Sequence, residues 1–379
     1  MNTREKIPES VKFRLWGKAA GRCQFTGCNE PMYYDRLTKA EFNTAYLAHI
    51  YAVSPGGNRY DPELSPKLVK DISNLMLMCD KHHRDIDDKA NEGYYTAPFL
   101  LQMKAAHEQR IELITEIGSE HQSHVLLFGA KIGTHEVPLS YRVAAEAMLP
   151  HKYPAGTSAI ELGLKNAVFE DHTSEYWTFQ EKQLVEMFNR HVLPLKGSHD
   201  VQHFSIFALA PIPLLIRLGT LLSDIYSADV YQKHREPNTW KWQTITTDHP
   251  INFSKPSDTS GVPALKISLS GTITDDRIAK VMGGGASIYH ITIPVPDNDF
   301  LKSKAHLANF RTTLRHALDH IKSIHGHDQV LHVFPAVPVS AAVELGRVWM
   351  PKADMAMCIY DQNNKLNNFI PTLTIKHHD

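Results

Sequence analysis

Two short pairs of soft metal ligands constrain this chain most: Cys23 and Cys28 in a C-x4-C pair, and Cys79 and His82 in a C-x2-H pair. Zn2+ needs four tetrahedral nitrogen or sulfur donors, and two loops that each present two donors meet that demand with little loss of chain entropy. Disulfide frameworks are denser in cysteine and are not interleaved with histidine. The sequence therefore predicts a structural zinc site rather than buried free cysteines beside a surface histidine.

Three further polar residues follow a set order around these pairs. They are His49 in Leu-Ala-His-Ile-Tyr, Asn74 in Ile-Ser-Asn-Leu-Met-Leu-Met-Cys, and His83 directly after His82. Here the chain resembles the HNH, or ββα-metal, nuclease family in its zinc-supported form. The resemblance implies an α+β domain in which His49 is the general base, Asn74 orients the strand of His49, and His83 holds a catalytic divalent ion such as Mg2+.

These implied roles agree with the chemistry of phosphodiester hydrolysis. Imidazole can make a nucleophile from water near neutral pH, and a hard cation neutralises charge that develops on the phosphate. Many HNH enzymes have a metal-binding Asp immediately before the base, whereas this chain has Ala48. The cation is then expected to depend on His83 and water molecules, or on Asp85 or Asp87.

Composition limits where such a protein can act. No apolar run approaches the roughly 20 residues that span a bilayer, and the N-terminus lacks the apolar stretch of a signal peptide. A cytoplasmic protein without membrane contact is expected. The net charge of −1 means that any DNA contact is local. The polar stretch 118–123 predicts a boundary between a first domain at residues 1–121 and a second at residues 122–379.

The second domain contains an internal repeat. Phe207-Ala-Leu-Ala-Pro211, followed by Leu218-Gly219, aligns without gaps with Phe334-Pro-Ala-Val-Pro338, followed by Leu345-Gly346. Helix-like stretches at residues 179–193 and 301–324 precede the two copies, and strands ending in glycine, 125–129 and 267–271, precede those. Each half, about 122–255 and 256–379, thus predicts a strand–helix–strand order with a parallel sheet.

The two copies also predict a ligand site. Ligands of open α/β sheets collect at the carboxyl ends of the strands, where helix N-termini favour phosphate. The corresponding loops are residues 210–213 and 337–340. A pocket made from two related halves suits a nearly symmetric ligand.

The second domain resembles the SAVED domain, which joins two CARF-like Rossmann-type halves. The motifs that carry the resemblance are Leu209-Ala-Pro-Ile-Pro-Leu-Leu-Ile-Arg-Leu-Gly219, Tyr231-Gln-Lys-His-Arg235 with Trp240-Lys-Trp242, and His332-Val-Phe-Pro-Ala-Val-Pro-Val-Ser340 with Glu344-Leu-Gly-Arg347. The resemblance implies a sensor of cyclic di- or trinucleotides in bacterial CBASS anti-phage systems. The whole chain is similar to HNH–SAVED effector nucleases.

Candidate ligand residues lie near the predicted strand ends. They are Lys131, Pro211, Ile212, Pro213, Arg235, Trp240, Trp242, Lys266, Ser268, Ser270, Gly271, Pro338 and Ser340. An indole can stack on a base, and a lysine or serine can contact phosphate. The alternatives are that the tryptophans belong to the core and that the serines cap a strand.

Three functions remain open from the sequence. The first is a double-stranded DNA endonuclease that a cyclic oligonucleotide activates and that assembles into a larger homo-oligomer on binding it. The second is a zinc-stabilised DNA-binding regulator with a small-molecule sensor. The third is a restriction-type HNH nuclease whose second domain reads a modified base, for which a duplicated sensor is a poor fit.

Overall fold

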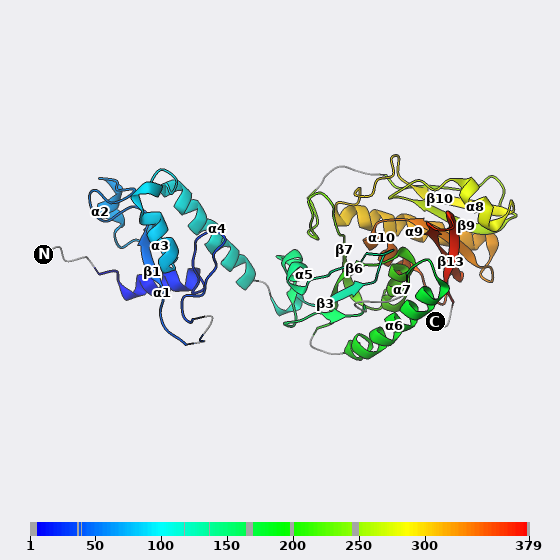
Figure 1. Cartoon of the computed structure of the whole chain (residues 1–379), viewed down its shortest axis with the longest axis horizontal. Helices are drawn as coiled ribbons and strands as arrows, with labels where there is room; N and C mark the ends of the chain where they lie inside the picture. The colour runs from blue at the N-terminus through cyan, green and yellow to red at the C-terminus, as the bar shows by residue number, and fades with distance from the viewer. Residues whose placement is uncertain are drawn as a thin grey trace. The chain divides into compact units, whose positions relative to one another are not determined.

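The chain forms two compact units, Met1–Gly118 and Ser119–Asp379, shown in Figure 1. The structure is a computed structural model that describes residues 6–376 apart from 36–37, 39, 117, 136, 164–169, 198–200 and 245–249. Among these residues, no helix is both long and apolar enough to cross a membrane.

The first unit combines two strands with several helices. Its elements are α1 (Glu9–Lys18), β1 (Tyr46–His49), α2 (Leu64–Leu68), η1 (Ile72–Asn74), β2 (Leu75–Met78), α3 (Asp80–Asp87), η2 (Lys89–Asn91) and α4 (Ala97–Thr115). β1 and β2 pair antiparallel, with Tyr46 opposite Met78 and His49 opposite Leu75. α3 begins directly after β2, which gives a strand–strand–helix order.

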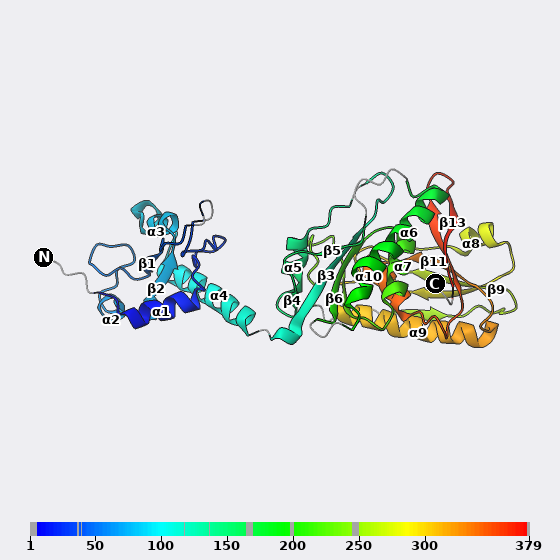
Figure 2. The same ribbon diagram turned by 90° about the horizontal axis from the view of Figure 1, so that it is seen from below.

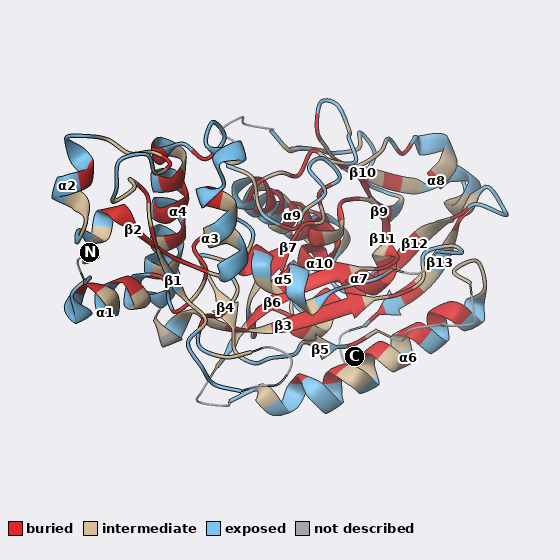
Figure 3. Ribbon diagram, turned by 60° about the vertical axis from the view of Figure 1, so that its left-hand side comes forward, coloured by how far each residue is buried: buried red, intermediate tan, exposed pale blue. Residues whose placement is uncertain are grey.

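Apolar side chains from four elements hold the first unit together. β2 is buried along its whole length, and it packs in one cluster with Leu15 of α1, Ile86 of α3 and Leu100 of α4. Full burial of an apolar side chain of this size stabilises the folded state by roughly 1.5–3 kcal/mol relative to leaving it exposed. The polar positions of α3 are left on its outer side, where Figure 3 shows exposed residues.

The second unit is a larger α/β structure. Its elements are η3 (Ser119–His121), β3 (Gln122–Gly129), α5 (Tyr141–Met148), β4 (Tyr153–Pro154), β5 (Ile160–Glu161), α6 (Ser174–His191), η4 (Leu193–Leu195), β6 (His203–Leu209), α7 (Ile212–Leu222), β7 (Ser227–Tyr231), β8 (Asn252–Ser254), β9 (Val262–Ser268), α8 (Asp275–Met282), β10 (Ala286–Thr292), α9 (Lys304–His325), β11 (Leu331–Ala336), α10 (Val339–Val348), β12 (Met357–Asn363) and β13 (Asn368–Ile375).

These strands form two sheets. The first has the order β4-β3-β6-β7, with β5 also beside β3, and all its pairings are parallel. The second has the order β13-β12-β11-β9-β10-β8, and its four central strands are parallel. Its edge strands β8 and β13 are antiparallel, so the predicted parallel sheet is confirmed for the central strands but not for the two edges. β13 follows β12 through a short turn, and a turn this short joins antiparallel strands.

The two sheets repeat one another. β3, β6 and β7 of the first correspond in order and pairing to β9, β11 and β12 of the second. Phe207 stacks on Tyr231 with ring centroids 4.4 Å apart, and Phe334 stacks on Tyr360 at 4.3 Å. The duplication predicted from the sequence is therefore confirmed as a pair of related α/β halves.

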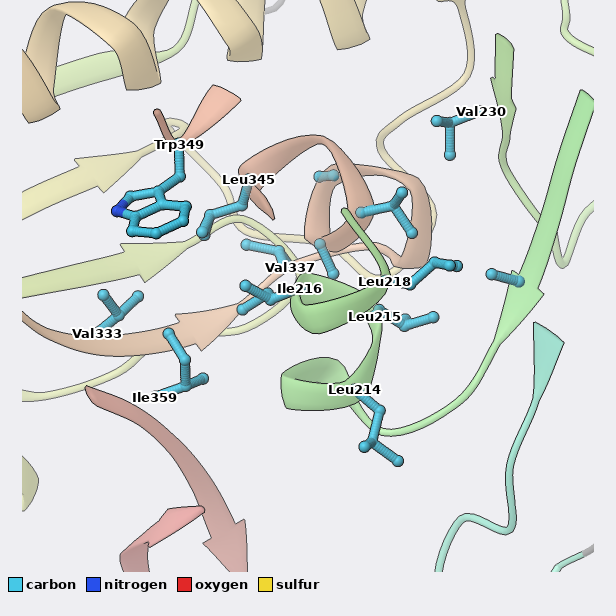
Figure 4. Close-up of a cluster of buried hydrophobic side chains, with 14 of the residues drawn as sticks. Leu214, Leu215, Ile216, Leu218, Val230, Val333, Val337, Leu345, Trp349 and Ile359 are labelled. Carbon is cyan, nitrogen blue, oxygen red and sulfur yellow. The ribbon is translucent and has the colours of Figure 1, made fainter. Parts of the chain in front are cut away.

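The core of the second unit lies between the sheets. α7 packs against α10, and these helices contact α6 and α9 respectively, as can be followed in Figure 2. One buried cluster contains side chains from both sheets and from all four helices. Figure 4 shows Ile216 and Leu218 of α7 beside Val337 and Leu345 of the other half. Because this core is shared, neither half buries its apolar face alone.

Candidate functional site

The four predicted zinc ligands come together in the first unit, with ligand atoms all within 4.8 Å of one another. Cys28 Sγ and Cys79 Sγ are 4.0 Å apart, and His82 Nδ1 lies 3.1 Å from Cys79 Sγ and 3.8 Å from Cys23 Sγ. Zinc–sulfur bonds of about 2.3 Å in a tetrahedral site separate ligand atoms by about 3.8 Å. Both the donor set and its spacing fit a tetrahedral zinc ion.

Neighbouring residues hold the two ligand loops in place. The Gln24 N–H donates to the Leu77 carbonyl, and the Leu77 N–H donates to Gln24 Oε1, both at 2.8 Å. This pair joins the first loop to the strand that precedes Cys79. The ring of Phe25 stacks on His82, with centroids 4.0 Å apart, and so fixes the plane of the imidazole.

Burial shifts the acid–base properties of this cluster. It raises the pKa of the Cys23 and Cys28 thiols and lowers the pKa of the His82 imidazole. For Cys23, Cys28 and His82 these shifts favour the neutral donors. A divalent cation can satisfy such a set by displacing the thiol protons, which couples metal binding to folding.

His49, the predicted base, is the last residue of β1. Its Nε2 lies 3.0 Å from the Val69 carbonyl oxygen. A carbonyl oxygen only accepts hydrogen bonds, so Nε2 carries the hydrogen and Nδ1 carries the basic lone pair. With its hydrogen on Nε2, the imidazole can accept a proton at Nδ1.

Asn74 holds the chain just beyond His49. Its side chain is buried, its Oδ1 accepts from the Tyr51 N–H at 2.7 Å, and its Nδ2 donates to the Tyr51 carbonyl at 3.1 Å. The Ile50 N–H also donates to the Asn74 carbonyl at 2.9 Å. These contacts are the ones that a strand-orienting residue would make, while its role in catalysis stays a prediction.

His83, the predicted metal ligand, lies in the first turn of α3, where its N–H donates to the Cys79 carbonyl at 2.9 Å. Its ring stacks on Tyr46 of β1, with centroids 4.8 Å apart. His83 Nε2 is 3.6 Å from Asp87 Oδ2, one helical turn along. α3 therefore presents a nitrogen donor and a carboxylate donor together.

The structure separates the two acidic candidates for the place usually held by an Asp at Ala48. Asp85 accepts from the Tyr95 hydroxyl at 2.7 Å and from Asn91 Nδ2 at 3.0 Å, and its contact with Tyr95 raises the pKa of that phenol to about 12. Asp85 thus ties α3 to the segment that follows. Asp87 is half exposed and faces His83, so it is the better candidate cation ligand.

Sequence reasoning missed Arg59. Its guanidinium is buried and contacts Asp87 at 3.0 Å and the Ile50 carbonyl at 2.7 Å. Arg59 lies in a loop, is not one of the HNH residues His49, Asn74 and His83, and belongs to no periodic pattern. The only signal was the presence of a cation in the segment between His49 and Asn74, which by itself suggests a surface residue.

The two predicted ligand loops lie at the carboxyl ends of β6 and β11, which end at Leu209 and Ala336. Each loop leads into a helix, α7 or α10. The N–H and hydroxyl of Ser340 both donate to Gln232 Oε1, at 3.1 and 2.8 Å. Because Gln232 directly follows β7, this contact joins the carboxyl edges of the two halves.

Several predicted ligand residues gather at these edges. Lys131 and Pro211 lie near each other, because the Ala130 N–H donates to the Leu209 carbonyl at 3.3 Å. The second half brings further residues together through Ala336, which pairs with Ser268 and accepts from the Ser270 N–H at 2.9 Å. Those residues are Ser268, Ser270, Gly271 and Pro338. Ile212 and Pro213 begin α7.

Some of these side chains already have partners. Lys266 Nζ contacts Asp275 Oδ1 at 2.5 Å, and the Ser268 hydroxyl accepts from the Ile273 N–H at 3.3 Å. Arg235 is exposed, and its backbone N–H donates to Asp299 at 3.1 Å. Contact of these residues with a phosphate stays a prediction.

The two tryptophans pack inside the protein. Trp240 is 5% exposed and meets the edge of Phe207 at 5.4 Å. Trp242 is partly buried and meets His234 edge-on at 5.7 Å. These contacts give both indoles a structural role, and stacking on a base stays a prediction.

A hollow of about 730 Å³ lies elsewhere in the second unit, lined by residues that include Asp224, Arg311, Arg315 and Arg347. Asp224 precedes β7, and Arg347 is near the end of α10, so this hollow is at the amino-terminal edge of the strands. None of the predicted ligand residues lines it. It is thus distinct from the predicted carboxyl-edge site.

Comparison with protein families identifies the second unit. The model of the SAVED family, described as the SMODS-associated and fused to various effectors sensor domain, matches residues 184–375. The chain belongs to the SAVED family. The match begins within α6 and reaches the last strand, so it includes the crossing of α7 and α10. No curated protein matches the chain.

Solved structures that resemble this SAVED chain include Cap4 receptors. The Acinetobacter baumannii Cap4 SAVED/CARF-domain containing receptor with the cyclic trinucleotide 2'3'3'-cAAA has a TM-score of 0.42 and 14% identity, over 84% of this chain and 67% of that one. The Moraxella osloensis Cap4 SAVED/CARF-domain containing receptor has a TM-score of 0.40 and 12% identity, over 84% of this chain and 70% of that one.

Proposed function

We propose that this protein is a metal-dependent double-stranded DNA endonuclease that a cyclic oligonucleotide activates, and that it degrades DNA in bacterial anti-phage defence. The observation that carries the proposal is the strand–strand–helix arrangement of the first unit. It places His49 at the end of β1, Asn74 in η1, and His83 in α3 directly after the cluster residue His82. This order of elements resembles that of zinc-supported HNH nucleases, which supports the proposal, and the second unit belongs to the SAVED family.

In this proposal His49 removes a proton from water. Its Nδ1 accepts the proton as the water oxygen attacks phosphorus, while the hydrogen bond from Nε2 to Val69 holds the ring in place. A divalent cation held by His83 and Asp87 would neutralise charge on the phosphate and on the leaving oxygen. Asn74 keeps the end of β1 aligned, and a zinc ion on the Cys₃His ligands would tie the start of α3 to the loop of Cys23 and Cys28.

The SAVED unit supplies the control. No part of it that the structure describes resembles a second nuclease site, and a nuclease with weak sequence preference would damage its host if it were always active. A ligand whose affinities for the two states differ by roughly 5.5 kcal/mol would move an equilibrium from almost all inactive to almost all active. The proposed ligand is a cyclic di- or trinucleotide at the joined carboxyl edges.

Assembly is part of the same proposal. A single small HNH unit contacts one strand at a time, so cutting both strands is easier when two such units are brought together. Ligand binding is expected to drive association of protomers into a larger homo-oligomer. Sedimentation with and without the activating ligand tests this: an unchanged mass while cleavage switches on would rule assembly out.

The decisive experiment adds a panel of cyclic di- and trinucleotides to the purified full chain with plasmid DNA and Mg2+. The expected result is cleavage with one or a few panel members and none without ligand. Product ends should show little sequence preference, and salt should inhibit steeply, because phosphate contacts dominate. DNA binding without cleavage would indicate a regulator, and a long recognition sequence at the ends would indicate a restriction enzyme.

A further inference from the structure

Arg59 has an unusual position in the first unit. It adopts φ 61, a left-handed conformation that residues with a Cβ rarely take. Its side chain is only 4% exposed. Its Nε donates to the Ile50 carbonyl at 2.7 Å, its Nη1 to the Ile86 carbonyl at 2.5 Å, and its Nη2 to Asp87 Oδ1 at 3.0 Å.

This pattern of contacts needs a guanidinium. A buried cation is costly unless its donors are satisfied, and here three donors find acceptors on α3 and on the residue that follows β1. The planar fork of arginine reaches three acceptors at fixed angles, whereas the lysine ammonium is a single point of charge.

The acceptors lie next to the proposed catalytic groups. Ile50 directly follows His49, and its N–H is held by the Asn74 carbonyl. Asp87 is the carboxylate that faces His83, at 3.6 Å. One side chain therefore connects the end of the strand that carries the base to the helix that carries the proposed cation ligands.

We propose that Arg59 is a positioning residue of the nuclease site. It fixes the separation between the His49 end of β1 and the His83–Asp87 turn of α3, and it orients the Asp87 carboxylate. This inference rests on the proposed nuclease function. A purely structural role would predict instead that any variant that folds with its zinc has full activity.

The experiment compares full-length Arg59→Met, Arg59→Lys, Asp87→Asn and the double variant Arg59→Met/Asp87→Asn with the wild type. Arg142→Met is the matched control, because Arg142 is an exposed guanidinium paired with Glu146 on α5. Zinc content and thermal unfolding first show that each variant is folded. Mn2+ binding to the ligand-free protein is then measured by calorimetry, and kcat and KM on plasmid DNA are measured with the panel's most active cyclic oligonucleotide.

Loss of a group that supports metal ligands typically lowers metal affinity or activity by about 10- to 100-fold. Arg59→Met should therefore lose Mn2+ affinity and kcat by about that factor with little change in KM, and Arg59→Lys should recover part of the loss. The loss from Arg59→Met and Asp87→Asn together should be smaller than the product of the two single losses, because one acts through the other. Arg142→Met should match the wild type.

The outcomes distinguish the positioning role of Arg59 from the proposed nuclease function. Wild-type kcat and Mn2+ affinity in a folded, zinc-loaded Arg59→Met protein would overturn the role of Arg59 and leave the nuclease standing. If Arg59→Met does not fold, wild-type values for Arg59→Lys would overturn that role equally. If the wild type cleaves with no panel member, the proposed function fails, and the Mn2+ affinities alone decide whether Arg59 organises the site. A wild type that neither cleaves nor binds Mn2+ would overturn both.

Discussion

Gly219 of α7 and Gly346 of α10 meet where the two helices cross. A Cβ added to Gly219 would lie 2.0 Å from the Val343 carbonyl oxygen, and a Cβ added to Gly346 would lie 2.0 Å from the Ile216 carbonyl oxygen. Each glycine lets the backbone of the other half approach. The contact is reciprocal, as expected for two copies of one unit related by a local twofold axis.

Alanine at either glycine should destabilise the second unit. The added methyl group would meet a backbone oxygen that cannot move without separating the helices, so we expect a loss of about 3 kcal/mol or more in the free energy of unfolding. Denaturant unfolding of Gly219→Ala and Gly346→Ala measures it. Gly17→Ala is the control, because nothing lies within 4 Å of a Cβ there and alanine favours the helix. An unchanged midpoint for Gly219→Ala would contradict the close crossing.

Removal of one ligand of the Cys₃His cluster should unfold the first unit. Structural zinc contributes on the order of 10 kcal/mol to the folding of small modules, so Cys79→Ser should lose both zinc and the cooperative unfolding of residues 1–118. Metal analysis and limited proteolysis measure the two effects. Cys358→Ser, at a cysteine far from the cluster in sequence, should retain an equimolar amount of zinc. A well-folded, zinc-free Cys79→Ser protein would show that the cluster is not a structural zinc site.

His49→Ala should abolish DNA cleavage while leaving the fold and the ligand affinity nearly unchanged. A general base typically contributes about 100- to 10,000-fold to the rate, and the ring contacts the backbone carbonyl of Val69 rather than the apolar core of the unit. Cleavage of plasmid DNA with activating ligand measures the effect, and EDTA should silence the wild type. His327→Ala, at an exposed site in the other unit, should cleave normally. Full nicking activity in His49→Ala would remove His49 from the role of base.

The second unit should lose stability as pH rises through the titration of Asp361. Burial, with a smaller contribution from Asp171, raises the pKa of Asp361 from 3.8 to about 7. The folded protein thus keeps a proton that the unfolded chain has released, and stability falls by about 1.4 kcal/mol per pH unit between these values. Asp361→Asn should remove this slope and stabilise the protein by about 2–4 kcal/mol at about pH 8.

Thermal unfolding of the second unit across this pH range checks the effect of Asp361→Asn. The matched control is Asp328→Asn, since Asp328 is fully exposed and its replacement should leave the pH dependence unchanged. If Asp361→Asn has the same pH slope as the wild type, the carboxyl of Asp361 is not the group responsible.

Much of the architecture is readable in the sequence because it depends on local patterns. The repeated Leu-Gly at 218–219 and 345–346 predicted two related halves, and the structure has them. The antiparallel edge strands β8 and β13 were not predicted. The direction of an edge strand depends on the length of the turn before it and on which edge of the sheet it can join, and a local sequence pattern contains neither. The spacing of Cys23, Cys28, Cys79 and His82 predicted a four-ligand cluster, and the structure brings these residues together.

By itself the sequence determined which residue types are available and how they recur: soft ligands in pairs, histidines in the HNH order, and duplicated strand ends. Only the tertiary structure decided which of Asp85 and Asp87 faces His83, that Arg59 joins β1 to α3, and that Gln232 of one half meets Ser340 of the other. The physical reason is that these contacts involve backbone carbonyls or single side chains from distant segments. Such pairings have no periodicity and no fixed spacing, so they are specified only when the packed core brings the segments together.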